Sequence, residues 1–340
     1  MTYTGEGESS VSGGAGIRGH DHALGEGAMD TRLWASAGLN AAITVAEVLG
    51  GVASGSVSLL SDAAHNASDV MAVGLALWAR RLGRRPPTTR HTYGFRRAEV
   101  VAALANAVTL IVVTALIARE AVQRLLHPEP VARGLMLAVA LGAFVANVAS
   151  VFLLRRHREE DVNVRSAFLH MAQDALASLA VVVAALLAGT AAGPWVDPAA
   201  AILIGLVVLR SAIALVWETV STLLEGAPAG VDVNELAASV GRAFGDGRLH
   251  HVHVWQAGPG QLLLTGHVTV GAEESANTVE VLLTEIKAVL HARWGVSHAT
   301  LEPEVTACEA NGLLGSWEAP AAAPTVARTR DPGNARGTGD

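Results

Sequence analysis

Two copies of one short pattern carry the most chemistry in this sequence. His65 and Asp69 stand four residues apart, and His170 and Asp174 repeat the same spacing later in the chain. Residues four apart share one face of a helix, so each pair points an imidazole and a carboxylate the same way. Both pairs lie in long apolar runs, where ionisable groups are costly unless they are paired, hydrated or bound to metal.

Two imidazole nitrogens and two carboxylate oxygens suit zinc or a similar borderline cation with tetrahedral geometry. The two pairs therefore predict one metal site shared by two helices. The alternative is a pair of structural His–Asp contacts that bond to other polar groups.

Further polar residues fall within the apolar runs. Asp62 lies one turn before His65. Its expected role is one of three: a residue on the ion's entry path, a support for the ligands, or a solvated acid at a helix end. Glu47 is the best candidate for a proton or pathway role, although a structural role is the favoured interpretation. Asn40, Asn106 and Asn147 are expected to hydrogen-bond between helices.

The composition indicates a membrane protein. The 340 residues are 51% hydrophobic and 16% charged, against about 25% charged in ordinary soluble domains. A net charge of -7 argues against nucleic-acid binding. The single cysteine, Cys308, excludes an internal disulfide and a cysteine-rich zinc fold. No apolar stretch lies near Met1, so we expect no cleaved signal peptide.

Six apolar segments are each long enough to cross a bilayer. We place them near 31–54, 57–81, 98–123, 132–154, 164–189 and 198–222. Arginines crowd the second and fourth connections between them, whereas the first and fifth have no basic residue and the third has Arg124 and Arg133. The positive-inside rule then predicts cytoplasmic second and fourth connections and two cytoplasmic termini.

The rest of the chain has a different character. Residues 1–29 predict a disordered tail containing His20 and His22, followed by a membrane domain over 30–224. Residues 225–306 predict a small soluble α+β domain with the order αββαβ, in which helices cover a mixed sheet. Residues 307–340 predict a second disordered tail.

Several stretches together resemble the cation diffusion facilitators, zinc/proton antiporters of the bacterial zinc-and-cadmium efflux type. They are Gly55-Ser56-Val57-Ser58-Leu59-Leu60-Ser61-Asp62-Ala63-Ala64-His65 continuing to Asp69, Thr92-Tyr93-Gly94-Phe95-Arg96-Arg97-Ala98-Glu99, Ala102-Ala103-Leu104-Ala105-Asn106, Trp195-Val196-Asp197-Pro198, Leu224-Glu225-Gly226-Ala227-Pro228 and His253-Val254-Trp255. The resemblance covers nearly the whole chain from Leu33 to Glu304.

The resemblance implies a homodimer in the inner membrane, with a cytoplasmic metallochaperone-like (ferredoxin-like) domain. It implies that the four residues above form the transport site, and that His250, His267 and His298 occupy positions for regulatory zinc. Two residues depart from the pattern. Phe95 stands where some members have a second histidine to partner His91, which stays a candidate pathway residue, and Thr300 stands where some have an aspartate.

The expected function is export of cytoplasmic Zn²⁺ in exchange for H⁺, with no enzymatic activity. Metal binding competes with protons for the same ligands, and His65 and His170 are the favoured proton carriers. Three alternatives stay open: another main substrate (Cd²⁺, Co²⁺, Ni²⁺, Fe²⁺ or Mn²⁺), a membrane metallohydrolase, and a non-transporting metal sensor or partner scaffold. Four protein ligands leave no open position for hydrolysis, which disfavours the second.

Overall fold

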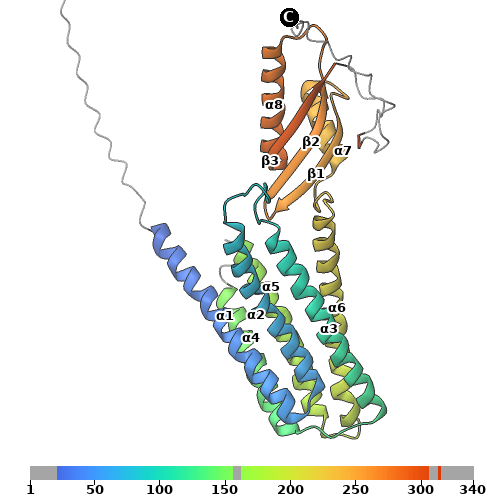
Figure 1. Cartoon of the computed structure of the whole chain (residues 1–340). Coiled ribbons are helices and arrows are strands. Elements are labelled where there is room, and N and C mark those ends of the chain that lie inside the picture. Colours follow the sequence, from blue (N-terminus) through green and yellow to red (C-terminus); the bar gives the residue numbers. More distant parts are fainter. Residues whose placement is uncertain (1–20, 156–161, 306–312, 315–340) are drawn as a thin grey trace, which may run out of the picture. The chain divides into compact units, whose positions relative to one another are not determined.

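The computed structural model describes residues 21–155, 162–305 and 313–314, and the chain divides into two compact units between Leu223 and Leu224 (Figure 1). The first unit contains helices α1 (Asp21–Ser54), α2 (Val57–Gly83), α3 (Ala98–Leu126), α4 (Arg133–Leu154), α5 (Val162–Leu187) and α6 (Gly193–Leu223). The second contains α7 (Val233–Phe244), β1 (Leu249–Gly258), β2 (Gln261–Thr269), α8 (Ala276–Trp294) and β3 (Val296–Glu304).

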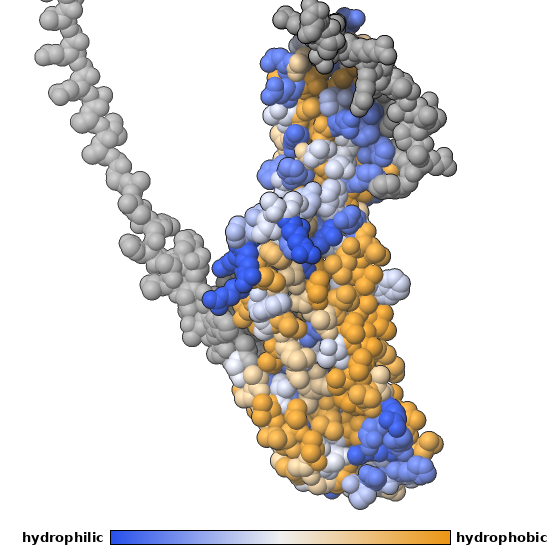
Figure 2. Space-filling view, viewed as in Figure 1, coloured by the Kyte–Doolittle hydropathy of each residue, from blue (hydrophilic) through white to orange (hydrophobic). Residues whose placement is uncertain are grey.

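The first unit is a helical membrane domain. Among the described residues, four helical stretches are long and apolar enough to cross a bilayer: Ala98–Leu126, Arg133–Phe152, Phe168–Leu187 and Gly193–Leu223. Apolar side chains cover much of the visible outer face of this unit (Figure 2). Large hydrophobic residues such as Val112 on α3 and Trp217 on α6 are exposed, as expected where lipid is the solvent.

Helix α2 occupies the middle of the bundle, since it packs against α1, α3, α5 and α6. Its sequence explains this position, because α2 has too many polar residues to face lipid and must turn them towards other helices. The turn into α2 uses Gly55, whose φ of 71° favours glycine, and Ser56 caps the helix by accepting a hydrogen bond from the Leu59 amide.

The second unit is a three-stranded sheet in the order β1-β2-β3, covered by helices. β1 and β2 form an antiparallel hairpin, and β3 pairs parallel with β2 after the α8 crossover. The core joins the apolar faces of the helices and the sheet, with members including Leu236, Val254, Leu264, Ile286 and Leu290. This arrangement confirms a small sheet-and-helix domain after the membrane helices.

Two predicted boundaries differ from the structure. Helix α1 begins at Asp21, so residues 21–29 are helical rather than part of a disordered tail, and no proline interrupts this stretch. Residues 1–20 lie outside the described residues. Of the predicted tail 307–340, only residues 313–314 are described, and there the Leu313 carbonyl accepts a hydrogen bond from the Val252 amide of β1 at 2.7 Å.

Candidate metal centre

The two His-x-x-x-Asp pairs meet inside the helical unit. One ligand atom from each of His65, Asp69, His170 and Asp174 lies within 4.8 Å of the others. The links between helices are as short as those within each pair. His65 Nε2 lies 3.7 Å from Asp174 Oδ1, and His170 Nε2 lies 3.5 Å from Asp69 Oδ2.

These separations match a zinc site. Zinc bonds to nitrogen and oxygen ligands are about 2.0–2.1 Å long, so the edge of a tetrahedron of ligands is about 3.3 Å. The shortest separations need to contract by only a few tenths of an ångström to reach that size, and the longest, at up to 4.8 Å, by more than 1 Å. The two imidazole rings stand edge to face, with centroids 6.1 Å apart.

Several buried ligand atoms of this cluster have no hydrogen-bond partner among the described residues. Asp174 is completely buried, and both of its carboxylate oxygens lack a hydrogen-bond partner among the described residues, as do His65 Nδ1 and Asp69 Oδ2. The side chains of His65, Asp69 and His170 stay 22–34% exposed. A buried carboxylate without donors is costly, and a divalent cation would offset that cost. An ion could reach the cluster from the side of the three partly exposed ligands.

Hydrogen bonds between helices hold α2 and α5 in place. Asn106 of α3 donates to Ser68 Oγ on α2 at 3.0 Å. Ser178 of α5 donates to Asp62 Oδ2 on α2 at 3.0 Å, and Asn147 of α4 donates to Ser178 Oγ. The predicted hydrogen-bonding roles of Asn106 and Asn147 are therefore confirmed. Asn40 Oδ1 has no partner among the described residues.

Asp197 fixes the beginning of α2, and sequence analysis assigned it no role. Its buried carboxylate accepts hydrogen bonds from Ser56 Oγ at 2.6 Å, Ser58 Oγ at 2.6 Å, the Val57 amide at 2.8 Å and the Ser58 amide at 3.2 Å. The signal in the sequence was an acid directly before Pro198 at the start of an apolar segment. Ser178 gave no such signal.

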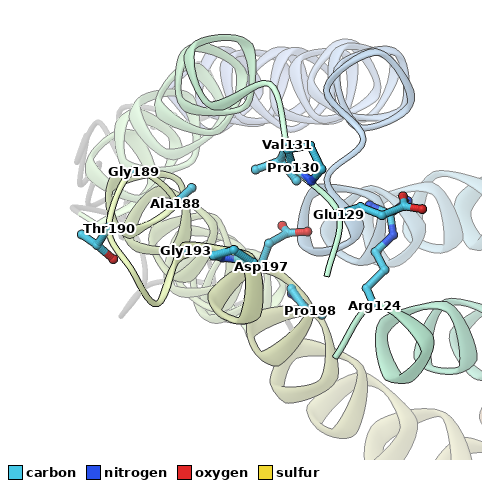
Figure 3. A pocket seen from close by; sticks show the side chains of 11 residues that line it. Arg124, Glu129, Pro130, Val131, Ala188, Gly189, Thr190, Gly193, Asp197 and Pro198 are labelled. Carbon is cyan, nitrogen blue, oxygen red and sulfur yellow. The ribbon is translucent and has the colours of Figure 1, made fainter. Parts of the chain in front are cut away.

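A small cavity of about 190 Å³ adjoins Asp197, at the end of the helical unit where α2 begins (Figure 3). Arg124, Glu129 and Thr190 contribute further polar groups to its lining. None of the four clustered ligands lines this cavity, so it is separate from the candidate metal centre.

The second unit contains another group of potential ligands. His250 Nε2 lies 3.1 Å from Glu304 Oε2, and His267 Nδ1 lies 2.8 Å from Glu304 Oε1. His250 and His267 are opposite each other on β1 and β2. His298 pairs with Leu263, four residues along β3 from the partner of His267, or about 13 Å away along the strand. Within one chain, Glu304 therefore joins the two histidines and His298 does not.

A β-bulge shapes this second group. The register shifts between His250 and His253, and His251 within the shift has a φ of 50°, unusual for a residue other than glycine. The His251 ring lies 4.6 Å from that of His267. Desolvation, followed by the nearby imidazoles of His267 and His253, lowers the pKa of His251. The lowered pKa favours the neutral form of the His251 imidazole, which has a lone pair available for a metal ion.

The remaining candidate histidines are not clustered with ligands. His91 lies in the connection between α2 and α3, its ring 4.6 Å from that of Phe95, and belongs to neither ligand group of the described residues. His20 and His157 lie outside the described residues, and only the backbone of His22 is described.

Comparisons with known proteins identify the family of this chain and agree with a helical membrane unit. The cation efflux transmembrane domain matches residues 33–224. The zinc transporter ZitB of Escherichia coli is 40% identical over 279 residues, which cover 82% of this chain and 88% of that protein. The metal cation efflux system protein CzcD of Cupriavidus metallidurans is 33% identical over 296 residues, covering 87% and 92%. A cadmium, cobalt and zinc/H⁺-K⁺ antiporter of Bacillus velezensis is 31% identical over 291 residues, covering 85% and 93%. The chain therefore belongs to the cation efflux family, the cation diffusion facilitators that its motifs resemble.

Proposed function

We propose that this protein exports Zn²⁺ from the cytoplasm in exchange for protons, with His65, Asp69, His170 and Asp174 as the transport site. One observation carries the proposal: two helices contribute four ligand atoms within 4.8 Å of one another inside an apolar bundle. The names of the relatives describe transport rather than catalysis, and zinc is the metal that the names of ZitB and the antiporter share.

The ligand chemistry supplies the exchange. Zinc binds neutral imidazole and ionised carboxylate, so protons compete with it for all four residues. Imidazole changes its charge in the physiological pH range, which makes His65 and His170 the favoured carriers. On the outer side, protonation would weaken the site and release zinc. The protonated site would then return to the cytoplasm. Cadmium and cobalt suit the same ligands, and a flux assay with a panel of metals ranks them.

All six helices α1–α6 are proposed to cross the bacterial inner membrane. At 34 and 27 residues, α1 and α2 are long enough, and α2 has its polar groups on the faces that it packs against its neighbours. The arginine-rich connections between α2 and α3 and between α4 and α5 then lie in the cytoplasm. So do both termini and the domain over 225–306.

A regulatory metal site in the second unit is the second part of the proposal. His250, His267 and Glu304 offer three ligand atoms in a cluster, which supports a site that leaves one position for a further ligand. The family resemblance implies that His298 belongs to this regulation and that the protein is a homodimer. Zinc bound between two such domains would reduce their repulsion and bias the membrane domain between its states.

The test is zinc-driven proton flux in liposomes containing the full-length protein. Zinc binding to four-ligand sites is worth about 10–16 kcal/mol, so the loss of one ligand should cost about 2.5–4 kcal/mol, or 10²–10³-fold in affinity. We expect His65→Ala and Asp174→Ala each to abolish the flux while helical content and the elution volume of the protein stay unchanged. His127→Ala, at the C-terminal end of α3 and outside both ligand groups of the described residues, is the control and should keep the flux. Undiminished flux in both ligand variants contradicts the site assignment.

A further inference from the structure

Two carboxyl groups meet in the interior of the helical unit, outside the four-ligand cluster. Glu47 of α1 and Asp62 of α2 are both completely buried, and Asn66, one turn after Asp62 on the same face of α2, donates a hydrogen bond to Glu47. In the described part of the chain, neither has an ion pair with a basic side chain. Two buried carboxylates without a basic partner would repel each other, and a proton on one of the two removes that repulsion.

The neighbouring donors account for the other carboxyl oxygens. Asn66 Nδ2 donates to Glu47 Oε2 at 2.7 Å, and Ser178 Oγ donates to Asp62 Oδ2 at 3.0 Å. Glu47 Oε1 and Asp62 Oδ1 are left without a protein donor. A proton on the pair would supply a donor where the protein supplies none. It would also remove the repulsion of two buried like charges, which is why paired carboxyl groups share a proton elsewhere.

The pair lies next to the zinc ligands along both helices. Asp62 precedes His65 by three residues on α2, and Ser178 follows Asp174 by four on α5, which is about one helical turn in each case. Asp174 lies one turn before Ser178, whose hydroxyl donates to Asp62. Negative charge at the proposed zinc site would therefore favour the protonated form of the pair.

We infer that Glu47 and Asp62 hold one proton between them and release it when zinc binds to the neighbouring four-ligand site. The inference rests on the proposed transport function. Zinc would change the charge of the site from about two negative to about neutral and so remove much of the field that holds the proton. In this step a carboxyl O–H bond breaks, its electron pair stays on the oxygen, and the proton passes to water. Reprotonation on the other side would favour zinc release.

Other charged groups on the packed helices are engaged elsewhere. Arg124 of α3 pairs with Glu120, Arg133 of α4 donates to the Ala185 carbonyl, and Asp197 of α6 caps α2. On α2 and α5, the titratable groups within about two turns of Asp62 and Ser178 are those of the proposed zinc site: His65 and Asp69 on α2, and His170 and Asp174 on α5. A change in charge at that site would therefore act on the pair at short range.

The experiment counts protons released per zinc bound. Full-length protein in detergent is titrated with zinc chloride in buffers of different ionisation enthalpy, and the calorimetric heats give the number of protons. Glu47→Gln and Asp62→Asn keep the shape of the pair without its proton. We expect each to bind one zinc at the four-ligand site and to release about one proton fewer than the unmodified protein. Thr219→Val, which removes a buried hydroxyl of α6 that bonds to carbonyls of its own helix, should leave the count unchanged.

Infrared difference spectra provide the second measurement. The carbonyl stretch of a protonated carboxylic acid should disappear when zinc binds to the unmodified protein and should be absent from the difference spectrum of Glu47→Gln. The inference is overturned if both variants release as many protons as the unmodified protein, or if both lose zinc binding while remaining folded. Failure of the proposed function gives a different result, namely unchanged zinc binding in His65→Ala and Asp174→Ala.

Discussion

Replacing Asp197 tests how the start of α2 positions the metal ligands. Its carboxylate is almost fully buried and accepts four hydrogen bonds, two from serine hydroxyls and two from the first amides of α2. It therefore acts as a helix cap supplied by α6, and its negative charge also complements the positive end of the α2 dipole. Asp197→Ala removes the acceptor and leaves four donors without it.

The expected cost can be worked out from these contacts. An ordinary capping residue is worth about 0.5–2 kcal/mol, whereas hydrogen bonds to a charged group are worth about 1.5–3 kcal/mol each. Four such bonds to one carboxylate are not additive, and the serine hydroxyls can turn to other acceptors. We therefore expect Asp197→Ala to destabilise the helical unit by about 3–5 kcal/mol, and Asp197→Asn, which keeps one acceptor oxygen, by about half of that.

The assay combines thermal unfolding, followed by circular dichroism in detergent, with zinc flux in liposomes. We expect the unfolding temperature to fall in the order unmodified, Asn variant, Ala variant. The initial flux should fall with it, because α2 carries two of the four ligands. Glu129→Ala is the matched control, since Glu129 lines the same cavity but has an exposed side chain. An Asp197→Ala protein as stable and as active as the unmodified one would refute the capping argument.

Three further changes have defined outcomes. Glu304→Gln should reduce the zinc bound by the full-length protein by one ion per chain in a calorimetric titration, whereas His298→Ala should not if the site lies within one chain. Gly50→Ala should destabilise the packing of α1 on α4 by about 1–3 kcal/mol in a thermal scan, since its Cβ would lie 2.7 Å from Val139 Cγ2. Hydrogen bonds from backbone amides lower the pKa of Asp232, so its contribution to stability is present above about pH 4 and is lost as the pH falls further. The free energy of unfolding, measured with urea at a series of acidic pH values, should therefore depend less on pH in Asp232→Ala than in the unmodified protein.

The helices and the ligands could be predicted from the sequence because both depend on local spacing. A four-residue interval puts His65 and Asp69 on one face of α2 wherever that helix packs. Long apolar runs likewise mark the membrane helices without knowledge of their neighbours. The beginning of α1 was misplaced because a polar, glycine-containing sequence weakens helix formation without excluding it.

Roles that depend on a partner far away in the sequence could not be predicted from the sequence. Asp197 matters because α6 places it against the start of α2, and Ser178 because α5 places it against Asp62. The second ligand group depended on the register of β3 against β2. This register sets Glu304 beside His267 and puts His298 at the other end of the strand. No spacing along the chain encodes such an offset, so Glu304 could not be predicted as a neighbour of the two histidines, and the role that the resemblance implies for His298 stays a prediction.

The geometry of the proposed zinc ligands indicates how a small movement could release the ion. Each of α2 and α5 contributes one imidazole and one carboxylate, and the short links between the helices are 3.5 and 3.7 Å. Zinc sites tolerate departures of only about 0.2 Å in bond length. A shift of α2 against α5 by about 1 Å would therefore break the shell into two half-sites, each too weak to retain the ion. The bond from Ser178 to Asp62 crosses the same interface, so the movement that opens the zinc site would also disturb the carboxyl pair. Ion release and proton uptake would then be linked through one helix contact as well as through charge.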